Sequence, residues 1–155
     1  MIITISREYG AGGHTIGKSV AEELGIEFYD RDIIKGAMKE SGMDMSEVEK
    51  AEEEISRAGA FLRLISPAAY VDQQDNLHII EQRIILELAL KGPCVILGRC
   101  ANDILNKANV PSLDVFLYAS DIHRAARISG LIGSTDPTEI RKKMQKTDAA
   151  RHAFY

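Results

Sequence analysis

Several features that would place a protein in a special class are missing from this 155-residue sequence. No apolar run approaches the roughly 20 residues that a helix needs to span a bilayer. The N-terminus lacks the basic, apolar and cleavage regions of a signal peptide. There is no internal repeat and no low-complexity segment. These absences predict a cytoplasmic globular protein of one domain that does not associate with membranes.

An excess of basic residues is missing as well. Lysine and arginine number 19 against 23 aspartates and glutamates, which gives a formal net charge of -4. A dedicated DNA- or RNA-binding role is therefore not expected. The two cysteines, Cys94 and Cys100, do not have the spacing of metal ligands, and we expect both to be small buried residues.

Segments typical of strands and helices alternate along the chain. Short apolar or β-branched runs predict strands at residues 2–5, 26–30, 94–98 and 113–119. Periodicity, capping residues and glycine or proline stops predict helices at residues 14–24, 32–41, 46–65, 76–92, 99–108, 120–128 and from 136 toward 155. Residues 66–75 and 129–135 are predicted to be loops. Such alternation implies a parallel sheet with helices on both faces.

A phosphate-binding loop is predicted near the N-terminus, in one of two frames. The stretch GGHTIGKS, Gly12 to Ser19, fits the pattern G-x-x-x-x-G-K-[ST] letter for letter and would use Lys18 as its lysine. That frame leaves only about two helical turns before Gly25. The earlier frame places the loop at about residues 6–13, directly after the first strand. It leaves about three helical turns before Gly25.

Helical periodicity favours the earlier frame. At about 100° per residue, Ile16, Val20 and Leu24 lie within about 80° of each other and are predicted to form the core face. Lys18 then lies about 160° from the centre of that face, pointing to solvent. The predicted cradle is REYGAGGHT, in which backbone amides surround phosphate oxygens. Its nucleotide-binding residues are Gly10, Ala11, Gly12, Gly13, His14 and Thr15.

The earlier frame places Gly13 where the phosphate-binding lysine normally stands. A cation is still needed to offset the charge of a transferring phosphoryl group. Candidates are Arg7, His14 and, if the helix start is unwound or tilted, Lys18. Arg7 is preferred because a guanidinium can bind two phosphate oxygens at once, although it could instead form a surface ion pair with Glu8. Thr15 takes the position of the hydroxyl that binds Mg²⁺.

Four stretches together make the chain resemble the cytidylate kinase-like family of P-loop nucleoside monophosphate kinases. They are ITISREYGAGGHTIGKSVAEELGIEFYDRDII, CVILGRCANDIL, DVFLYASDIHRAARI and KTDAARHAFY. The resemblance implies a three-layer α/β/α fold with a mostly parallel sheet of about four strands. The family's fifth strand would be missing, which would leave the fourth strand as an exposed edge. A single domain over residues 1–155 is implied, with a core at 1–30 and 77–155 and a helical acceptor-binding insertion at about 31–76.

The resemblance also assigns site residues. It implies that Arg99, after the third strand, binds the acceptor phosphate, and that Asp30 and Asp32 lie where the acceptor nucleoside binds. The two aspartates could equally cap the following helix. A mobile lid at about residues 124–151 would bring arginines to the phosphates. Its residues would be Arg124, Arg127, Asp148 and Arg151, which could alternatively form a solvated face with internal ion pairs.

The leading functional hypothesis is an ATP- and Mg²⁺-dependent phosphotransferase acting on an acceptor such as CMP or dCMP, with Arg7, Arg127 and Arg151 as catalytic residues. A second hypothesis is a nucleotide-binding sensor or regulator with little transfer activity, favoured by the glycine at position 13. A third is a kinase of another small metabolite, because residues 31–76 would set the acceptor. A homodimer is possible under each hypothesis.

Overall fold

The computed structural model describes residues 1–31, 36, 79 and 81–152. The helices predicted at 32–41 and 46–65, the loop at 66–75 and the candidate residue Asp32 lie outside the described residues. The chain divides into two compact units, one of Met1–Asp30 with Gly92–Tyr155 and one of Arg31–Lys91. The whole of the proposed acceptor-binding insertion, about residues 31–76, belongs to the second unit, and its assignment stays a prediction.

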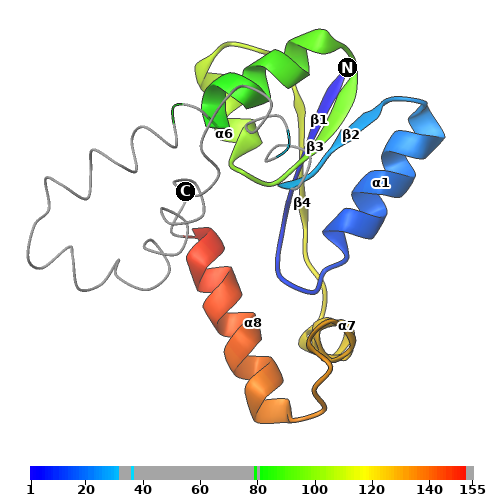
Figure 1. The fold of residues 1–155 in the computed structure, drawn as a ribbon, viewed down its shortest axis with the longest axis vertical. Coiled ribbons are helices and arrows are strands. Elements are labelled where there is room, and N and C mark those ends of the chain that lie inside the picture. The colour runs from blue at the N-terminus through cyan, green and yellow to red at the C-terminus, as the bar shows by residue number, and fades with distance from the viewer. Residues whose placement is uncertain (32–35, 37–78, 80, 153–155) are drawn as a thin grey trace, which may run out of the picture. The chain divides into compact units, whose positions relative to one another are not determined.

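The first unit is built on a parallel sheet (Figure 1). Among the described residues, its strands are β1 (Ile2–Arg7), β2 (Glu27–Tyr29), β3 (Cys94–Leu97) and β4 (Leu113–Leu117), in the spatial order β2-β3-β1-β4. In the register, Ile3 pairs with Val95 on one side and with Leu113 on the other. The carboxyl ends of β1 and β3 therefore meet at one edge, where open α/β sheets bind their ligands.

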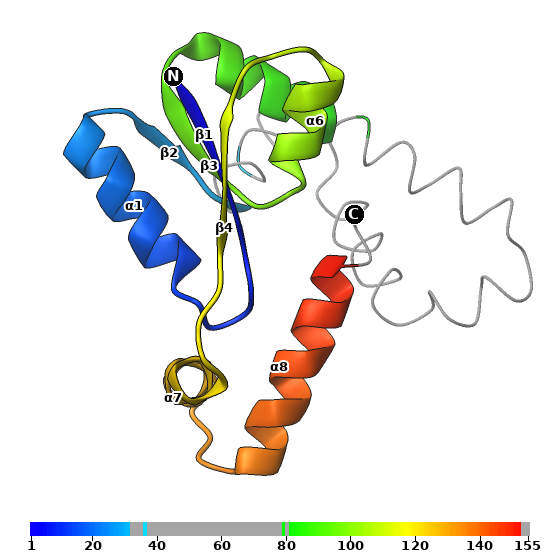
Figure 2. The same ribbon diagram turned by 180° about the vertical axis from the view of Figure 1, so that it is seen from behind.

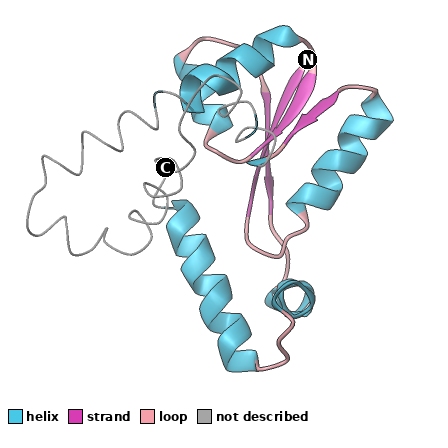
Figure 3. Ribbon diagram, in the orientation of Figure 1, coloured by secondary structure: helices cyan, strands magenta, loops and turns pink. Residues whose placement is uncertain are grey.

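Helices cover both faces of this sheet. Figures 1 and 2 show α1 (Gly13–Leu24) on one face and α6 (Ala101–Lys107) on the other. The chain continues into α7 (Asp121–Ile132) and α8 (Pro137–His152), which pack against each other (Figure 3). The predicted P-loop kinase-like α/β/α fold with four parallel strands is confirmed.

The core between α1 and the sheet is closed by small residues of the helix. Gly13, Gly17 and Ala21 are its buried positions, and a methyl group added at Gly17 would lie 2.8 Å from Phe28 Cε2. The predicted core face was wrong, because Ile16 and Leu24 are 41% and 46% exposed and Val20 is only partly buried. The helix lies too close to β1 and β2 for large side chains to fit between them.

The second half of the first unit differs from its prediction at several element ends. The strand predicted at 113–119 ends at Leu117, and the helix predicted from Arg99 begins at Ala101. The helix predicted to end near Ile128 continues to Ile132 and stops at Gly133, whose φ of 67° allows a left-handed cap. Residues 129–132 are therefore helical rather than part of a loop. Buried Ile128 on α7 packs with Ile140 and Met144 on α8, and Tyr9 from the loop after β1 covers this small core.

Two further sequence expectations can be compared with the structure. Cys94 and Cys100 are buried, as predicted, and form no disulfide bond. Burial raises the pKa of the Cys94 thiol above its usual value, which makes it a poor nucleophile. Among the described residues, no helix is both long and apolar enough to cross a membrane.

Only part of the second unit is described. Residues 81–91 are helical, and Ile84, Ile85, Leu88 and Ala89 are buried. These positions recur every three to four residues, as expected for one apolar helix face. The predicted helix at 76–92 is therefore present over its described residues.

Candidate phosphate-binding site

A short loop joins β1 to α1 at the carboxyl edge of the sheet. Because β1 extends to Arg7 and α1 begins at Gly13, the loop consists of residues 8–12 and starts two residues later than predicted. The Ala11 amide donates to the Glu8 carbonyl at 3.3 Å, which closes a tight turn. Gly10 stands third in this turn with φ 83°, a backbone conformation that residues with a side chain rarely adopt.

The N-terminal end of α1 is open. Gly12 caps the helix with φ 85° and provides no side-chain hydrogen bond. The first hydrogen bond of the helix is donated by the Ile16 amide to the Gly12 carbonyl at 3.0 Å. By helix geometry, the amides of Gly13, His14 and Thr15 have no helical carbonyl to bind. Together with the helix dipole, such amides favour an anion at this end.

The letter-perfect frame does not form a loop. Its central glycine, Gly17, is buried inside α1 against Phe28 and Ile5. Lys18 is 61% exposed and pairs with Glu22 at 3.9 Å, within the same helix. The loop therefore lies in the earlier frame, and Lys18 lies on the outer surface of α1 rather than at the loop.

Arg7 ends β1 and extends its side chain beneath the start of α1. A methyl group at Gly13 would lie 2.9 Å from Arg7 Cγ, and one at Gly98 would overlap Arg7 Nη1. The guanidinium thus occupies space that Gly98 leaves by having no side chain. Gly98, Arg99 and Cys100, directly after β3, all have positive φ, of 79°, 55° and 50°. Non-glycine residues in this strained conformation are concentrated at functional sites, and Arg99 is one of them.

On one side of the loop, His14 and Asp30 are brought together. His14 Nε2 lies 3.0 Å from Asp30 Oδ2, at the end of β2. The imidazole also contacts the Phe28 ring edge-on, with centroids 5.4 Å apart. His14 is 62% exposed and Asp30 is 15% exposed, so a ligand could reach the imidazole directly.

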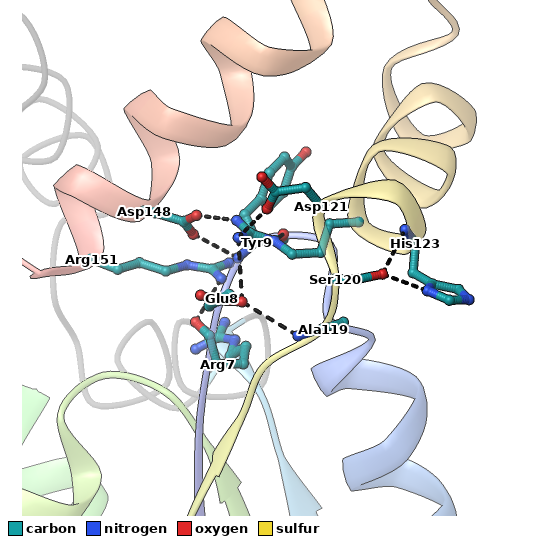
Figure 4. A network of polar contacts seen from close by, with 10 residues as sticks. Arg7, Glu8, Tyr9, Ala119, Ser120, Asp121, His123, Asp148 and Arg151 are labelled. Carbon is teal, nitrogen blue, oxygen red and sulfur yellow. Dashed lines mark hydrogen bonds and ion pairs between the residues drawn. The ribbon is translucent and has the colours of Figure 1, made fainter.

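On the other side of the loop, Arg124 joins it to α7 and α8 (Figure 4 shows its partners). Its side chain is 6% exposed, and its guanidinium pairs with Asp148, with Glu8 at 3.3 Å and with Asp121 at 3.7 Å. Arg124 Nε donates to the Tyr9 carbonyl at 2.8 Å, and the Tyr9 amide donates to Asp148 Oδ1 at 2.7 Å. Both backbone groups of Tyr9 are therefore fixed by side chains from α7 and α8.

Arg151 adds a second contact from α8. Its Nη1 donates to the Arg7 carbonyl at 3.0 Å, and its guanidinium carbon lies 5.5 Å from the centroid of the Tyr9 ring. Burial lowers the pKa of Arg151, and Asp148 opposes that shift. The predicted Asp148 and Arg151 pair thus contacts the loop backbone and positions it.

Arg127 lies over the open end of α1. Its Nη2 donates to Thr15 Oγ1 at 2.7 Å, and a methyl group at Gly12 would lie 3.2 Å from its Nη1. Both Arg127 and Thr15 are exposed. The Arg127 guanidinium therefore lies in front of the amides in the first turn of α1, where a ligand could contact both.

The structure thus gathers most of the predicted residues around one loop. The loop and the turn that follows β3 bring together Arg7, Arg99, Thr15 and Arg127. Lys18 lies away from them, on the outer surface of α1. Sequence reasoning missed the parts played by Tyr9 and Gly98. It considered Glu8 only as a surface ion-pair partner of Arg7, whereas Glu8 pairs with Arg124 at 3.3 Å.

The comparisons with known proteins agree with this arrangement. Residues 2–155 match the sequence model of the cytidylate kinase-like family. The chain belongs to that family. An uncharacterized protein from Eubacterium ventriosum has a similar crystal structure, with TM-score 0.66 and 24% identity over 100% of this chain and 77% of that chain. At this identity, the likeness shows the fold alone. None of the curated proteins compared matches this cytidylate kinase-like chain.

Membership of the cytidylate kinase-like family implies a nucleotide kinase, which uses a nucleotide and a metal ion. The predicted metal ligand, Thr15, has an exposed hydroxyl whose oxygen accepts one hydrogen bond from the Arg127 guanidinium, and its second lone pair suits a hard cation such as Mg²⁺. Among the described residues, no group of three His, Cys, Asp or Glu side chains could hold a metal ion. A metal would therefore take most of its ligands from the nucleotide phosphates and from water, as Mg²⁺ does in many nucleotide sites.

Proposed function

We propose that this protein is an ATP-dependent phosphotransferase whose acceptor is a nucleoside monophosphate of the CMP or dCMP type. The observation that carries the proposal is the open N-terminal end of α1, which faces the exposed Arg127 guanidinium across a glycine loop. Helix-start amides and a guanidinium are both donors to phosphate oxygens. Their meeting at the carboxyl edge of a parallel sheet supports a nucleotide phosphate at this place.

Each nearby residue has a role in the proposed reaction. The loop amides bind the donor β-phosphate, and Arg7 and Arg127 offset the charge of the transferring group. Arg99 binds the acceptor phosphate, and Asp30 contributes to the acceptor side through His14. Asp148 and Arg151 hold the loop backbone in shape. Phosphoryl transfer needs no covalent enzyme intermediate, so positioning and charge stabilisation account for the rate.

A second function, a nucleotide sensor with little transfer activity, is favoured by one specific observation. Gly13 is buried against Arg7 Cγ and Leu97 Cδ1, so position 13 provides neither a lysine nor room for one. A protein without that cation could bind ATP and respond to it while transferring phosphate slowly.

The two functions are distinguished by turnover. We expect ADP release when the protein is mixed with ATP, Mg²⁺ and one member of a panel of CMP, dCMP, UMP and AMP. Thermal stabilisation by ATP without turnover of any acceptor would favour the sensor. Turnover of another metabolite alone would retain the kinase but correct its acceptor.

The role of Arg7 has its own test. Arg7→Ala should weaken ATP binding by about tenfold or more, because a charge-assisted contact with phosphate is lost. Lys18→Ala is the matched control, since it removes an exposed cation that pairs with Glu22. Equal effects of the two substitutions on the ATP dissociation constant, measured by titration calorimetry, would contradict the assignment.

A further inference from the structure

The Arg7 side chain spans two parts of the proposed site. Its aliphatic stem passes the first residue of α1, since a methyl group at Gly13 would lie 2.9 Å from Arg7 Cγ and 3.2 Å from Cδ. Its guanidinium lies against Gly98, directly after β3, where a methyl group would lie 3.0 Å from Arg7 Cζ and 3.3 Å from Nη2. One side chain therefore extends from the phosphate loop to the turn that carries Arg99.

The backbone of Gly98 is held in place on both sides of that guanidinium. Gly98 is buried and has φ 79°, and its amide donates to the Ile5 carbonyl at 2.9 Å, which ties the turn to β1. The Ala101 amide donates to the Gly98 carbonyl at 3.1 Å and joins the turn to the start of α6. Because the turn is fixed in this way, a side chain at position 98 would displace the guanidinium.

The position of this guanidinium matters because a nucleotide kinase holds two anions close together. The terminal phosphate of the donor and the phosphate of the acceptor repel each other, so each anion alone would weaken the binding of the other. A guanidinium between them presents several N–H donors in a fixed fork and can bind oxygens of both. Position 13 supplies no such cation, because Gly13 is buried against the stem of Arg7.

We infer that Arg7 binds the donor and the acceptor phosphates together and makes the two substrates bind cooperatively, with Gly98 as the residue that sets the position of its guanidinium. The inference rests on the proposed phosphotransferase function and concerns how its two substrates are coupled. It assigns Arg7 to both substrates, whereas a cation that belonged to the phosphate loop alone would act on the donor only.

The test compares the affinity for CMP with and without AMP-PNP, a non-hydrolysable ATP analogue, in Mg²⁺ and by titration calorimetry. The wild-type protein should bind CMP about fivefold or more tightly when AMP-PNP is present, as is typical of coupled sites. Arg7→Gln should weaken the binding of both ligands and remove this enhancement, because the cation between the two phosphates is lost. Arg141→Gln removes an exposed positive charge from α8 and should leave the enhancement unchanged.

Gly98→Ala separates the position of the guanidinium from its charge. This variant keeps Arg7 but moves its guanidinium away from the turn after β3, so the affinity for CMP and the enhancement by AMP-PNP should both fall. Gly25→Ala is the matched control, since Gly25 also has a positive φ, of 62°, but a methyl group there would meet nothing within 4 Å. An equal loss of enhancement in the two glycine variants would contradict the inference.

The outcomes distinguish this inference from the proposed function. If Arg7→Gln weakens AMP-PNP binding but leaves the affinity for CMP unchanged, Arg7 serves the donor alone, and the inference is wrong while the proposed function survives. The same holds if wild type shows no enhancement. Absence of AMP-PNP binding would overturn both, and absence of CMP binding would overturn the inference and the proposed acceptor.

A second substitution covers the case in which Arg7→Gln fails to fold by circular dichroism. Arg7→Lys keeps the positive charge but replaces the fork of N–H donors by a single ammonium group. The enhancement of CMP binding by AMP-PNP should therefore decrease in Arg7→Lys. An unchanged enhancement in this variant would contradict the inference.

Discussion

The two flanks of the phosphate loop are built in different ways. The α7–α8 flank, formed by Arg124, Asp148 and Arg151, is buried or half-buried and binds the loop through backbone atoms of Arg7 and Tyr9. The α1–β2 flank, formed by His14 and Asp30, consists of one pair whose imidazole is mostly exposed. The first flank fixes the shape of the backbone, and the second leaves side chains that a ligand can contact.

This difference separates the charged residues that stabilise the fold around such a site from those that can contact a ligand. A buried guanidinium that satisfies several acceptors cannot be removed without leaving charges in a poorly hydrated place. An exposed ion pair contributes little, because water replaces the lost contact. The variants below test this contrast, starting with the largest expected effect.

Arg124→Met should be the most destabilising change. It leaves Asp148 and Glu8, which are 19% and 29% exposed, without the cation that both contact. Loss of one partner from such a buried pair lowers the free energy of unfolding by about 3 kcal/mol. Urea denaturation followed by circular dichroism measures the change. Arg141→Met, an exposed position on α8, is the control and should change stability by about 0.5 kcal/mol or less.

Gly10→Ala should have the next largest effect. Gly10 has φ 83°, and a methyl group would lie 2.8 Å from the Arg124 carbonyl. We expect a loss of about 2–3 kcal/mol, from a left-handed backbone that disfavours a side chain and from an overpacked contact with α7.

Gly133→Ala separates these two causes. Gly133 has φ 67°, but a methyl group there would meet nothing within 4 Å. This variant should lose only about 1 kcal/mol, the backbone contribution alone. Equal melting temperatures for Gly10→Ala and Gly133→Ala would show that the close approach of α7 to the loop is unimportant.

His14→Ala should have the smallest effect on stability. The pair with Asp30 joins a 62% exposed imidazole to a carboxylate, and exposed pairs contribute about 0.2–1 kcal/mol. Thermal unfolding of His14→Ala should therefore stay close to wild type. A loss as large as that of Arg124→Met would remove the distinction between the two flanks.

Much of the fold could be predicted from the sequence because its signals are local. The apolar strands, the caps at Ser120 and Asp136, and the glycine stop at Gly25 depend on neighbouring residues. The loop frame also followed from local geometry, since the later frame would leave only about two helical turns before Gly25. The core face of α1 was wrong, because periodicity selects the largest apolar side chains. Close packing on the sheet instead selected Gly13, Gly17 and Ala21.

The candidate site was harder to predict because its contacts join distant segments. Arg124 and Arg127 are three residues apart and look alike in the sequence, yet one is buried among carboxylates and the other is exposed beside Thr15. Asp121 on the same helix lies 3.7 Å from Arg124 but is exposed, whereas the partners that surround Arg124 lie in the loop after β1 and on α8. Gly98 gave no signal either, since its role is to make room for Arg7.

The hydrogen bond from Tyr9 to Asp148 spans 139 residues of chain. A ribosome therefore releases the loop after β1 long before the helix that shapes it. Until α8 has been synthesised and has docked, the amide of Tyr9 must be satisfied by water, and its carbonyl must wait for Arg124 on α7. Contacts of such long range form late and slow the final stage of folding. Ligand affinity should consequently arise only after α8 has been synthesised and has docked on the loop.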